Sequence, residues 1–207
     1  MTNALFAEQP NNIIDFPTQS KSNEWYTPAR YIEAARATMG GIDLDPASCE
    51  LANRTVKAAR YYTKEQNGLA QEWYGRVWLN PPYSSDKSPT GMSGGKQQGP
   101  TALFVAKLID AYSTGDVEQA IVCVNADMVR SWFQPLWDYV LCFSSHPIQF
   151  LRPSLKSEHH FFPTCFAYLG PHEQAFIDHF SPFGRIAKAI DSPRRAVAQP
   201  SLWEVRP

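Results

Sequence analysis

Several signatures that would fix a function at once are missing from this chain of 207 residues. Its four cysteines are scattered without CxxC spacing, and its five histidines form no HExxH pattern. We therefore expect buried, reduced thiols and no metal site. Gln97 follows Gly94-Gly95-Lys96 where a P-loop needs Ser or Thr, so this glycine-rich stretch is not a P-loop.

Long apolar runs and an excess of basic residues are also missing. No apolar run approaches the length of a membrane span, and the opening segment MTNALFAEQPNNIIDF lacks the basic start of a secretory signal. We therefore expect a globular protein of the cytoplasm with no membrane attachment, and we expect a monomer. The net charge of −1 leaves nucleic-acid binding open, because a local basic face suffices for it.

Composition divides the chain into a central domain and two tails. Residues 1–22 are polar and aperiodic, which predicts a flexible lead-in, and residues 191–207 predict a loose C-terminal tail. The domain spans 23–190. Within it, residues 84–100 are rich in Gly, Pro and Ser and predict a mobile loop of the kind that often forms a lid.

Helical and strand patterns alternate along most of the domain. Periodicity and end signals predict helices over 28–39, 49–60, 102–111, 128–138 and 173–180. Strands are expected over 42–45, 61–63, 76–79, 119–124, 140–143, 148–151, 161–169 and 184–190. Alternation along the first strand would place Ile42 and Leu44 on one face and Asp43 and Asp45 on the other. The order predicts an α/β sandwich with a mostly parallel sheet and an antiparallel C-terminal hairpin.

The stretch Leu79-Asn80-Pro81-Pro82-Tyr83 is the strongest functional signal in the chain. Its two prolines stiffen the turn after an apolar strand. The Asn80 amide oxygen and the Pro81 carbonyl can then accept both hydrogens of an amine on a ring, while Tyr83 stacks on that ring. This chemistry suits alkylation of an exocyclic amine. The structural alternative is a polar turn that follows a buried strand.

Two further segments are candidates for a ligand site at the carboxyl edge of the sheet. Thr27-Pro28 predicts a helix start, and Trp25 and Tyr26 either anchor that helix or cover a ligand. Asp43 and Asp45 lie where a strand opens into a loop, the edge at which open α/β sheets bind ligands. Their carboxylates suit ribose hydroxyls or an ammonium group, or else Asp45 or Ser48 caps the next helix.

These motifs resemble, in order and spacing, the phage-type Dam DNA N6-adenine methyltransferases. The resemblance is carried by Glu24-Trp25-Tyr26-Thr27-Pro28, by Asp43-Leu44-Asp45-Pro46-Ala47-Ser48, by Asn67-Gly68-Leu69 and by Asn80-Pro81-Pro82-Tyr83-Ser84. It continues weakly through Arg130 to Phe133 and Phe180 to Gly184, and so covers about 23–184. No GxG loop follows the first strand; Asp45-Pro46-Ala47-Ser48 occupies that place.

The resemblance implies a Rossmann-like methyltransferase fold, with a seven-stranded sheet whose last strand is antiparallel and with helices on both faces. It implies S-adenosylmethionine as cofactor and a flipped adenine in duplex DNA as substrate. Asn80, Pro81, Pro82 and Tyr83 would hold the adenine. The cofactor would be lined by Trp25, Tyr26, Thr27, Pro28, Asp43, Asp45, Pro46, Ala47, Ser48 and, near its adenine, Asn67.

Contacts with DNA are expected from basic residues outside these motifs. Lys87 and Lys96 lie in the glycine-rich loop, and Arg152 and Lys156 cluster with His159 further along. The role would be protection of bacteriophage DNA, as in restriction-modification, or orphan modification, and the cytoplasm would be the bacterial host's if a phage encodes the protein. The alternatives are a protein-glutamine or RNA amino-methyltransferase that uses the same site, and a non-catalytic DNA-binding module on this fold.

Overall fold

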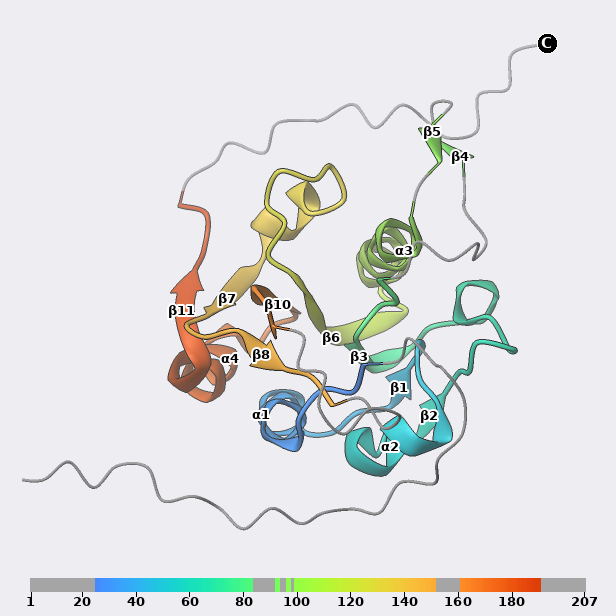
Figure 1. Cartoon of the computed structure of the whole chain (residues 1–207), viewed down its shortest axis with the longest axis horizontal. Helices are drawn as coiled ribbons and strands as arrows, with labels where there is room; N and C mark the ends of the chain where they lie inside the picture. Colours follow the sequence, from blue (N-terminus) through green and yellow to red (C-terminus); the bar gives the residue numbers. More distant parts are fainter. Residues whose placement is uncertain (1–24, 84–91, 94–95, 98, 152–160, 191–207) are drawn as a thin grey trace, which may run out of the picture.

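The computed structural model describes residues 25–83, 92–93, 96–97, 99–151 and 161–190 (Figure 1). Its centre is a seven-stranded sheet in the order β11-β7-β10-β6-β3-β1-β2. The strands are β1 (Leu44–Asp45), β2 (Arg60–Tyr61), β3 (Gly75–Leu79), β6 (Val117–Asn125), β7 (Val140–Ser144), β10 (Thr164–Leu169) and β11 (Gly184–Ala187). Two small antiparallel pairs lie outside it: β4 (Met92–Ser93) with β5 (Lys96–Gln97), and β8 (Ile148–Gln149) with β9 (Phe161–Phe162).

The sheet is mixed, so the prediction of a mostly parallel sheet is wrong. The pairs β1–β2, β1–β3 and β3–β6 are parallel, whereas β10 runs antiparallel to both β6 and β7, and β11 runs antiparallel to β7. The predicted C-terminal hairpin is also wrong, because β10 and β11 lie on either side of β7 instead of pairing with each other. The intervening helix α4 (Glu173–Phe180) and turn η3 (Ser181–Phe183) carry the chain across β7.

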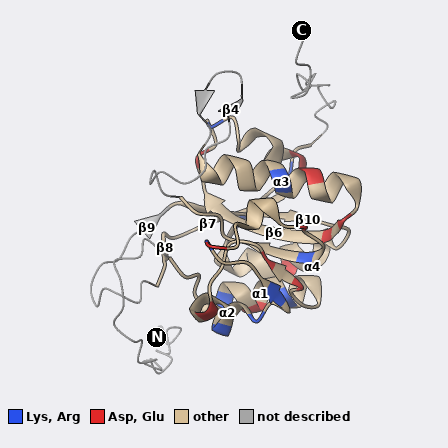
Figure 2. Ribbon diagram, turned by 90° about the vertical axis from the view of Figure 1, so that its right-hand side faces the viewer, with Lys and Arg blue, Asp and Glu red and all other residues tan. Residues whose placement is uncertain are grey.

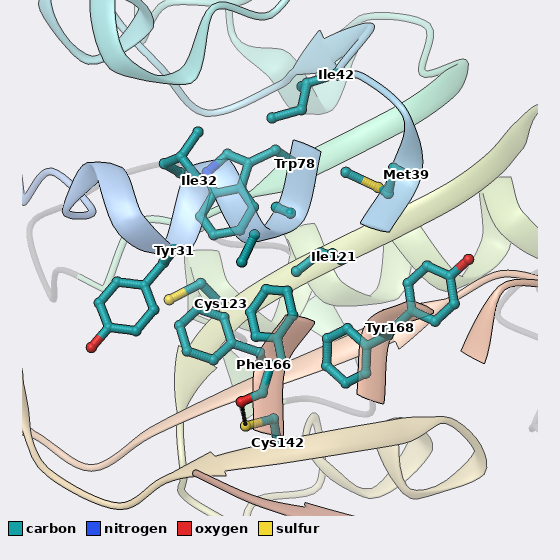
Figure 3. Close-up of a cluster of buried hydrophobic side chains, with 14 of the residues drawn as sticks. Tyr31, Ile32, Met39, Ile42, Trp78, Ile121, Cys123, Cys142, Phe166 and Tyr168 are labelled. Atoms are coloured by element: carbon teal, nitrogen blue, oxygen red, sulfur yellow. Dashed lines mark hydrogen bonds between the residues drawn. The ribbon is translucent and has the colours of Figure 1, made fainter. Parts of the chain in front are cut away.

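Helices cover both faces of the sheet, as predicted (Figure 2). Helices α1 (Ala29–Met39), α2 (Glu50–Val56) and α4 lie on one face, where Ile32 and Phe176 belong to the first core cluster together with Trp78 of β3. Figure 3 shows Ile32 and Trp78 within this cluster. Helix α3 (Pro100–Thr114) lies on the other face, with η2 (Gln134–Asp138), and its Phe104 and Leu108 belong to the second cluster. Alternate residues of β3 and β6 therefore serve two separate cores.

The first strand differs from its predicted pattern. Ile42 packs in the cluster of Trp78, whereas Leu44 packs in the cluster of Val77, so the two residues lie on opposite faces. The regular strand begins only at Leu44, and the chain enters it through Gly40 and Gly41, both with positive φ. The predicted alternation from Ile42 is wrong, because the pleated strand begins only at Leu44 and does not include Ile42.

Two helices match their predicted ends within one residue, and three differ: α3 extends beyond the predicted 102–111 at both ends, and the other two are shorter than predicted. Helix α1 ends at Met39 with Gly40 in the left-handed conformation, and α4 spans the residues predicted for it. Helix α2 stops at Val56, because Lys57 takes a left-handed conformation with φ 51°. The helix predicted over 128–138 is reduced to η2, since turns occupy 128–133 and Pro135 allows only a short 3-10 segment. None of the helices in the described part is long and apolar enough to cross a membrane.

Candidate active site

The carboxyl ends of the parallel strands bring three sequence motifs to one edge of the sheet. Strand β1 ends at Asp45, and β3 ends at Leu79, directly before Asn80. Strands β1 and β3 are neighbours in parallel register, with Leu44 opposite Val77. The segment 25–28 reaches the same edge, because the Asn80 side chain bonds to two of its residues. Segments 25–28, 45–48 and 80–83, which the sequence predicted as one site, are therefore neighbours.

The amide of Asn80 is held in one orientation. Its Nδ2 donates to the carbonyl oxygen of Trp25 at 3.1 Å and lies 3.4 Å from the hydroxyl of Thr27. Its Oδ1 is buried and has no hydrogen-bond partner among the described residues. Buried amide oxygens are rarely left without a donor, so this atom can accept a hydrogen bond from a group outside the described residues.

The rest of the motif is anchored to two elements on either side of it. The Pro82 carbonyl accepts a hydrogen bond of 2.8 Å from the Thr101 hydroxyl, which ties the turn to the start of α3. The Tyr83 hydroxyl donates to the Cys123 carbonyl of β6 at 2.8 Å. Burial raises the pKa of Tyr83 well above its usual value, so the phenol stays neutral. The ring is thus fixed at its far end while the side chain remains partly exposed.

The segment 25–28 is fixed by its backbone. Tyr26 and Leu151 form an antiparallel bridge, with N–H to carbonyl distances of 2.8 and 2.9 Å in the two directions. The Tyr26 hydroxyl lies 3.3 Å from the Cys49 sulfur. The prediction that Thr27 caps the first helix is wrong: α1 begins after Pro28 with no side-chain cap, and the buried Thr27 hydroxyl faces Asn80.

Asp45 is a buried carboxylate without a cation beside it in the described structure. Its side chain is almost fully buried, and its Oδ1 accepts one hydrogen bond, from the Ala47 amide at 3.2 Å. Burial raises the pKa of Asp45 to about 7, because the charged form loses its hydration. The Ser48 side chain lies close enough to the Asp45 carboxyl to offset part of this rise in pKa, but its buried Oγ makes no hydrogen bond of good geometry among the described residues. Cys49, and not Asp45 or Ser48, caps α2 through its sulfur. These groups suit a polar or cationic ligand.

Asp43 lies apart from this cluster and is already engaged. It forms a bidentate ion pair with Arg76 near the start of β3, with Oδ2 2.8 Å from Nε and Oδ1 2.7 Å from Nη2. The Arg76 backbone N–H adds a third bond to Oδ2 at 2.9 Å. The hydrogen bond from the Arg76 side chain holds the pKa of Asp43 below its usual value. The geometry therefore favours a structural role for this residue over the cofactor role predicted for it.

Asn67 begins a tight turn that packs on the Asp45–Ser48 segment. Asn67 itself is exposed, with φ 51°, and η1 (Gly68–Ala70) follows it. A Cβ on Gly68 would lie 1.9 Å from the Pro46 carbonyl oxygen, so only glycine fits here. The turn and the Pro46 backbone are consequently in direct contact, which brings Asn67 near the candidate site.

The remaining predictions fall wholly or partly outside the described residues. Lys87, Arg152, Lys156 and His159 lie outside them, as do residues 1–22, most of 84–100 and the tail 191–207. Lys96 lies in β5, but its side chain is outside the described set. Within the described ranges no group of three or more His, Cys, Asp or Glu side chains is arranged to hold a metal ion.

Comparison with known proteins identifies the family. The family model described as DNA N-6-adenine-methyltransferase (Dam) matches residues 17–160, which is more than half of the chain and contains all three segments of the site. No curated protein and no solved structure matches the chain. The extent of the family match is sufficient for assignment, and this chain belongs to the DNA N-6-adenine-methyltransferase (Dam) family.

Proposed function

We propose that this chain transfers a methyl group from S-adenosylmethionine to the N6 amine of an adenine flipped out of duplex DNA. The observation that supports this most is the buried, unpartnered Oδ1 of Asn80. The bonds of Nδ2 to Trp25 and Thr27 fix which side of the amide carries the oxygen, and none of the described residues donates to that oxygen. An exocyclic amine supplies the missing N–H.

The chemistry assigned to the motif follows from its acceptors. Asn80 Oδ1 accepts one N6 hydrogen and the Pro81 carbonyl accepts the other, which leaves the nitrogen lone pair free to react. The Tyr83 ring, held by the Cys123 carbonyl, stacks on the purine. Positioning of this kind contributes about 7–11 kcal/mol to a barrier at best. A strong base is unnecessary, because the ammonium formed on transfer loses its proton afterwards.

The residues of the Asp45–Ser48 segment fit the cofactor. Asp45 is a carboxylate that lacks a cation in the described structure, and the buried Ser48 Oγ beside it makes no hydrogen bond of good geometry there. Asp45 takes the ammonium group or a ribose hydroxyl of S-adenosylmethionine, while Trp25 to Pro28 line its methionine end and Asn67 its adenine end. When bound, the cofactor supplies an electrophilic methyl group on a sulfonium sulfur, which the amine nitrogen receives.

Base flipping follows from the position of the acceptors. The N6 amine of a stacked adenine is out of reach of a buried amide, so the enzyme must extrude the base into the site. The unstacking costs a few kcal/mol, which contacts with the DNA backbone must offset.

The proposal is tested by transfer of label from tritiated S-adenosylmethionine to unmethylated duplex DNA, with RNA and protein extract in parallel. Label in DNA alone supports the proposal. Label in RNA or in protein glutamine keeps the amine-methylating site but replaces the substrate. Cofactor binding absent from the purified chain, together with no transfer, would leave a non-catalytic DNA-binding module and overturn the proposal.

A further inference from the structure

Lys107, on α3, makes contacts that the chemistry described so far does not use. Its Nζ donates to the carbonyl oxygen of Leu69 at 2.7 Å and also to that of Gln71. The ammonium lies 5.5 Å from the centre of the Trp73 ring, within the range of a cation–π contact. Partial burial lowers the pKa of Lys107. Partial burial of a charged amine costs free energy unless neighbouring carbonyls accept its hydrogen bonds.

The two carbonyls that accept hydrogen bonds from Lys107 belong to the turn after Asn67. Trp73 supports the same turn, since its buried Nε1 donates to the Gly68 carbonyl at 2.8 Å. Lys107 and Trp73 together bind the outward carbonyls of three residues of one short segment, Gly68, Leu69 and Gln71. These hydrogen bonds fix the segment against α3 and against the second core cluster, to which Trp73 belongs.

The other side of this turn contacts the candidate cofactor segment. Gly68 lies so close to the Pro46 carbonyl oxygen that a Cβ would be 1.9 Å from it. Pro46 follows Asp45, and the Ser48 amide donates to the Tyr62 carbonyl at 2.9 Å. A shift of the turn would thus change the contact between Gly68 and Pro46, and with it the position of Asn67 relative to the segment of Asp45 and Ser48.

We infer that Lys107 is a positioning residue for the nucleoside end of the cofactor pocket. It touches no reacting atom and acts through the turn of residues 67–71. Loss of its amine should weaken binding of any ligand that carries the nucleoside and leave the transfer step at Asn80 intact. This inference rests on the proposed function, because it presupposes that S-adenosylmethionine binds between the turn and the Asp45–Ser48 segment.

The test compares Lys107→Met, which keeps the aliphatic stem, with Lys107→Gln, which keeps an NH2 group as donor but loses the charge. We expect the Kd for S-adenosylmethionine to rise about tenfold in Lys107→Met, equivalent to about 1.4 kcal/mol, and less in Lys107→Gln. At saturating cofactor, kcat should stay within about twofold of the wild type. The Kd of 5′-methylthioadenosine, which lacks the amino-acid end, should rise by the same factor. Lys188→Met is the matched control, because that exposed lysine pairs with Glu173 of α4 on the opposite face of the sheet.

The outcomes separate the inference from the proposed function. Wild-type protein that fails to bind S-adenosylmethionine would overturn both. Wild-type binding with an unchanged Kd in Lys107→Met and Lys107→Gln would overturn the inference alone. A fall in both kcat and melting temperature, without a selective rise in Kd, would overturn the inference and show that Lys107 is merely structural. If Lys107→Met does not fold, the same criteria apply to Lys107→Gln.

Discussion

Replacing Asp45 by Asn should stabilise the free protein at alkaline pH while it destroys cofactor binding. Burial raises the pKa of Asp45 to about 7, against about 3.9 for an aspartate in an unfolded chain. The folded state therefore keeps a proton that the unfolded chain releases between about pH 4 and pH 7. Stability from this group is present at low pH and is lost as the pH rises through that window.

The size of the change in folding stability follows from the pKa shift of Asp45. A difference of about three pKa units corresponds to about 4 kcal/mol at pH 8, where Asp45 is ionised in both states. At pH 5 the same linkage costs only about 1.5 kcal/mol. The neutral amide escapes this cost, so the stability of Asp45→Asn relative to the wild type should grow by about 2–3 kcal/mol between pH 5 and pH 8. Urea denaturation at several pH values, followed by tryptophan fluorescence, measures it.

Asp43→Asn is the control, because this substitution should change folding stability at alkaline pH in the opposite direction. The pKa of Asp43 is lowered by the hydrogen bond from Arg76, so ionised Asp43 stabilises the protein above its unfolded pKa, and this variant should lose stability at pH 8. Cofactor affinity of the wild type should fall as the pH drops through about 7, since protonated Asp45 cannot pair with an ammonium group. A relative stability of Asp45→Asn that does not change with pH would refute the reasoning.

Three further predictions concern the site directly. Asn80→Ala should reduce turnover to less than about a tenth of the wild-type rate and leave the Kd of S-adenosylmethionine, measured by calorimetry, nearly unchanged. Thr27→Val keeps the shape but removes one contact of the Asn80 amide, so kcat should fall about threefold to tenfold with little change in melting temperature; an unchanged kcat would contradict the role assigned to Thr27. Gly68→Ala places a Cβ 1.9 Å from the Pro46 carbonyl and should lower the melting temperature and weaken cofactor binding together, whereas normal binding would show that the turn is free to move.

Local signals in the sequence were sufficient for most of the elements that form the site. Strand β3 is a short apolar run that stops at a stiff Asn-Pro-Pro turn, and β6 is a buried apolar run, so both were predicted within one or two residues. The carboxyl-edge rule then brought Asp45 and Asn80 together without any knowledge of the sheet order. The motif residues could be predicted because the residues that act together are consecutive in the sequence.

What the sequence did not predict depends on partners far away along the chain. Asp43 resembles Asp45 in the sequence pattern, but Arg76, 33 positions later, donates hydrogen bonds to both of its carboxylate oxygens. Thr27 has the local pattern of a helix cap, and only the position of Asn80 shows that its hydroxyl has another partner. Lys107 carries no motif at all, and its contacts exist only because α3 packs beside the turn after Asn67.

The mixed sheet was missed for a related reason. An isolated apolar strand such as β10 contains no information about its direction, which depends on where the preceding connection leaves the chain. The segment before β10 includes residues 152–160, and no periodic pattern in them indicated a helical crossover. Patterns of alternation and capping predict the helices and strands and where they end. The order and direction of the strands in the sheet depend on how the elements pack.

Identification of the methylated nucleoside tests the central claim most directly. Unmethylated duplex DNA is incubated with S-adenosylmethionine and either the wild type or Asn80→Ala, then digested to nucleosides and analysed by mass spectrometry. The account predicts N6-methyladenine with the wild type and less than about a tenth as much with Asn80→Ala. Methylation of a different base, or equal N6-methyladenine with both proteins, would contradict it.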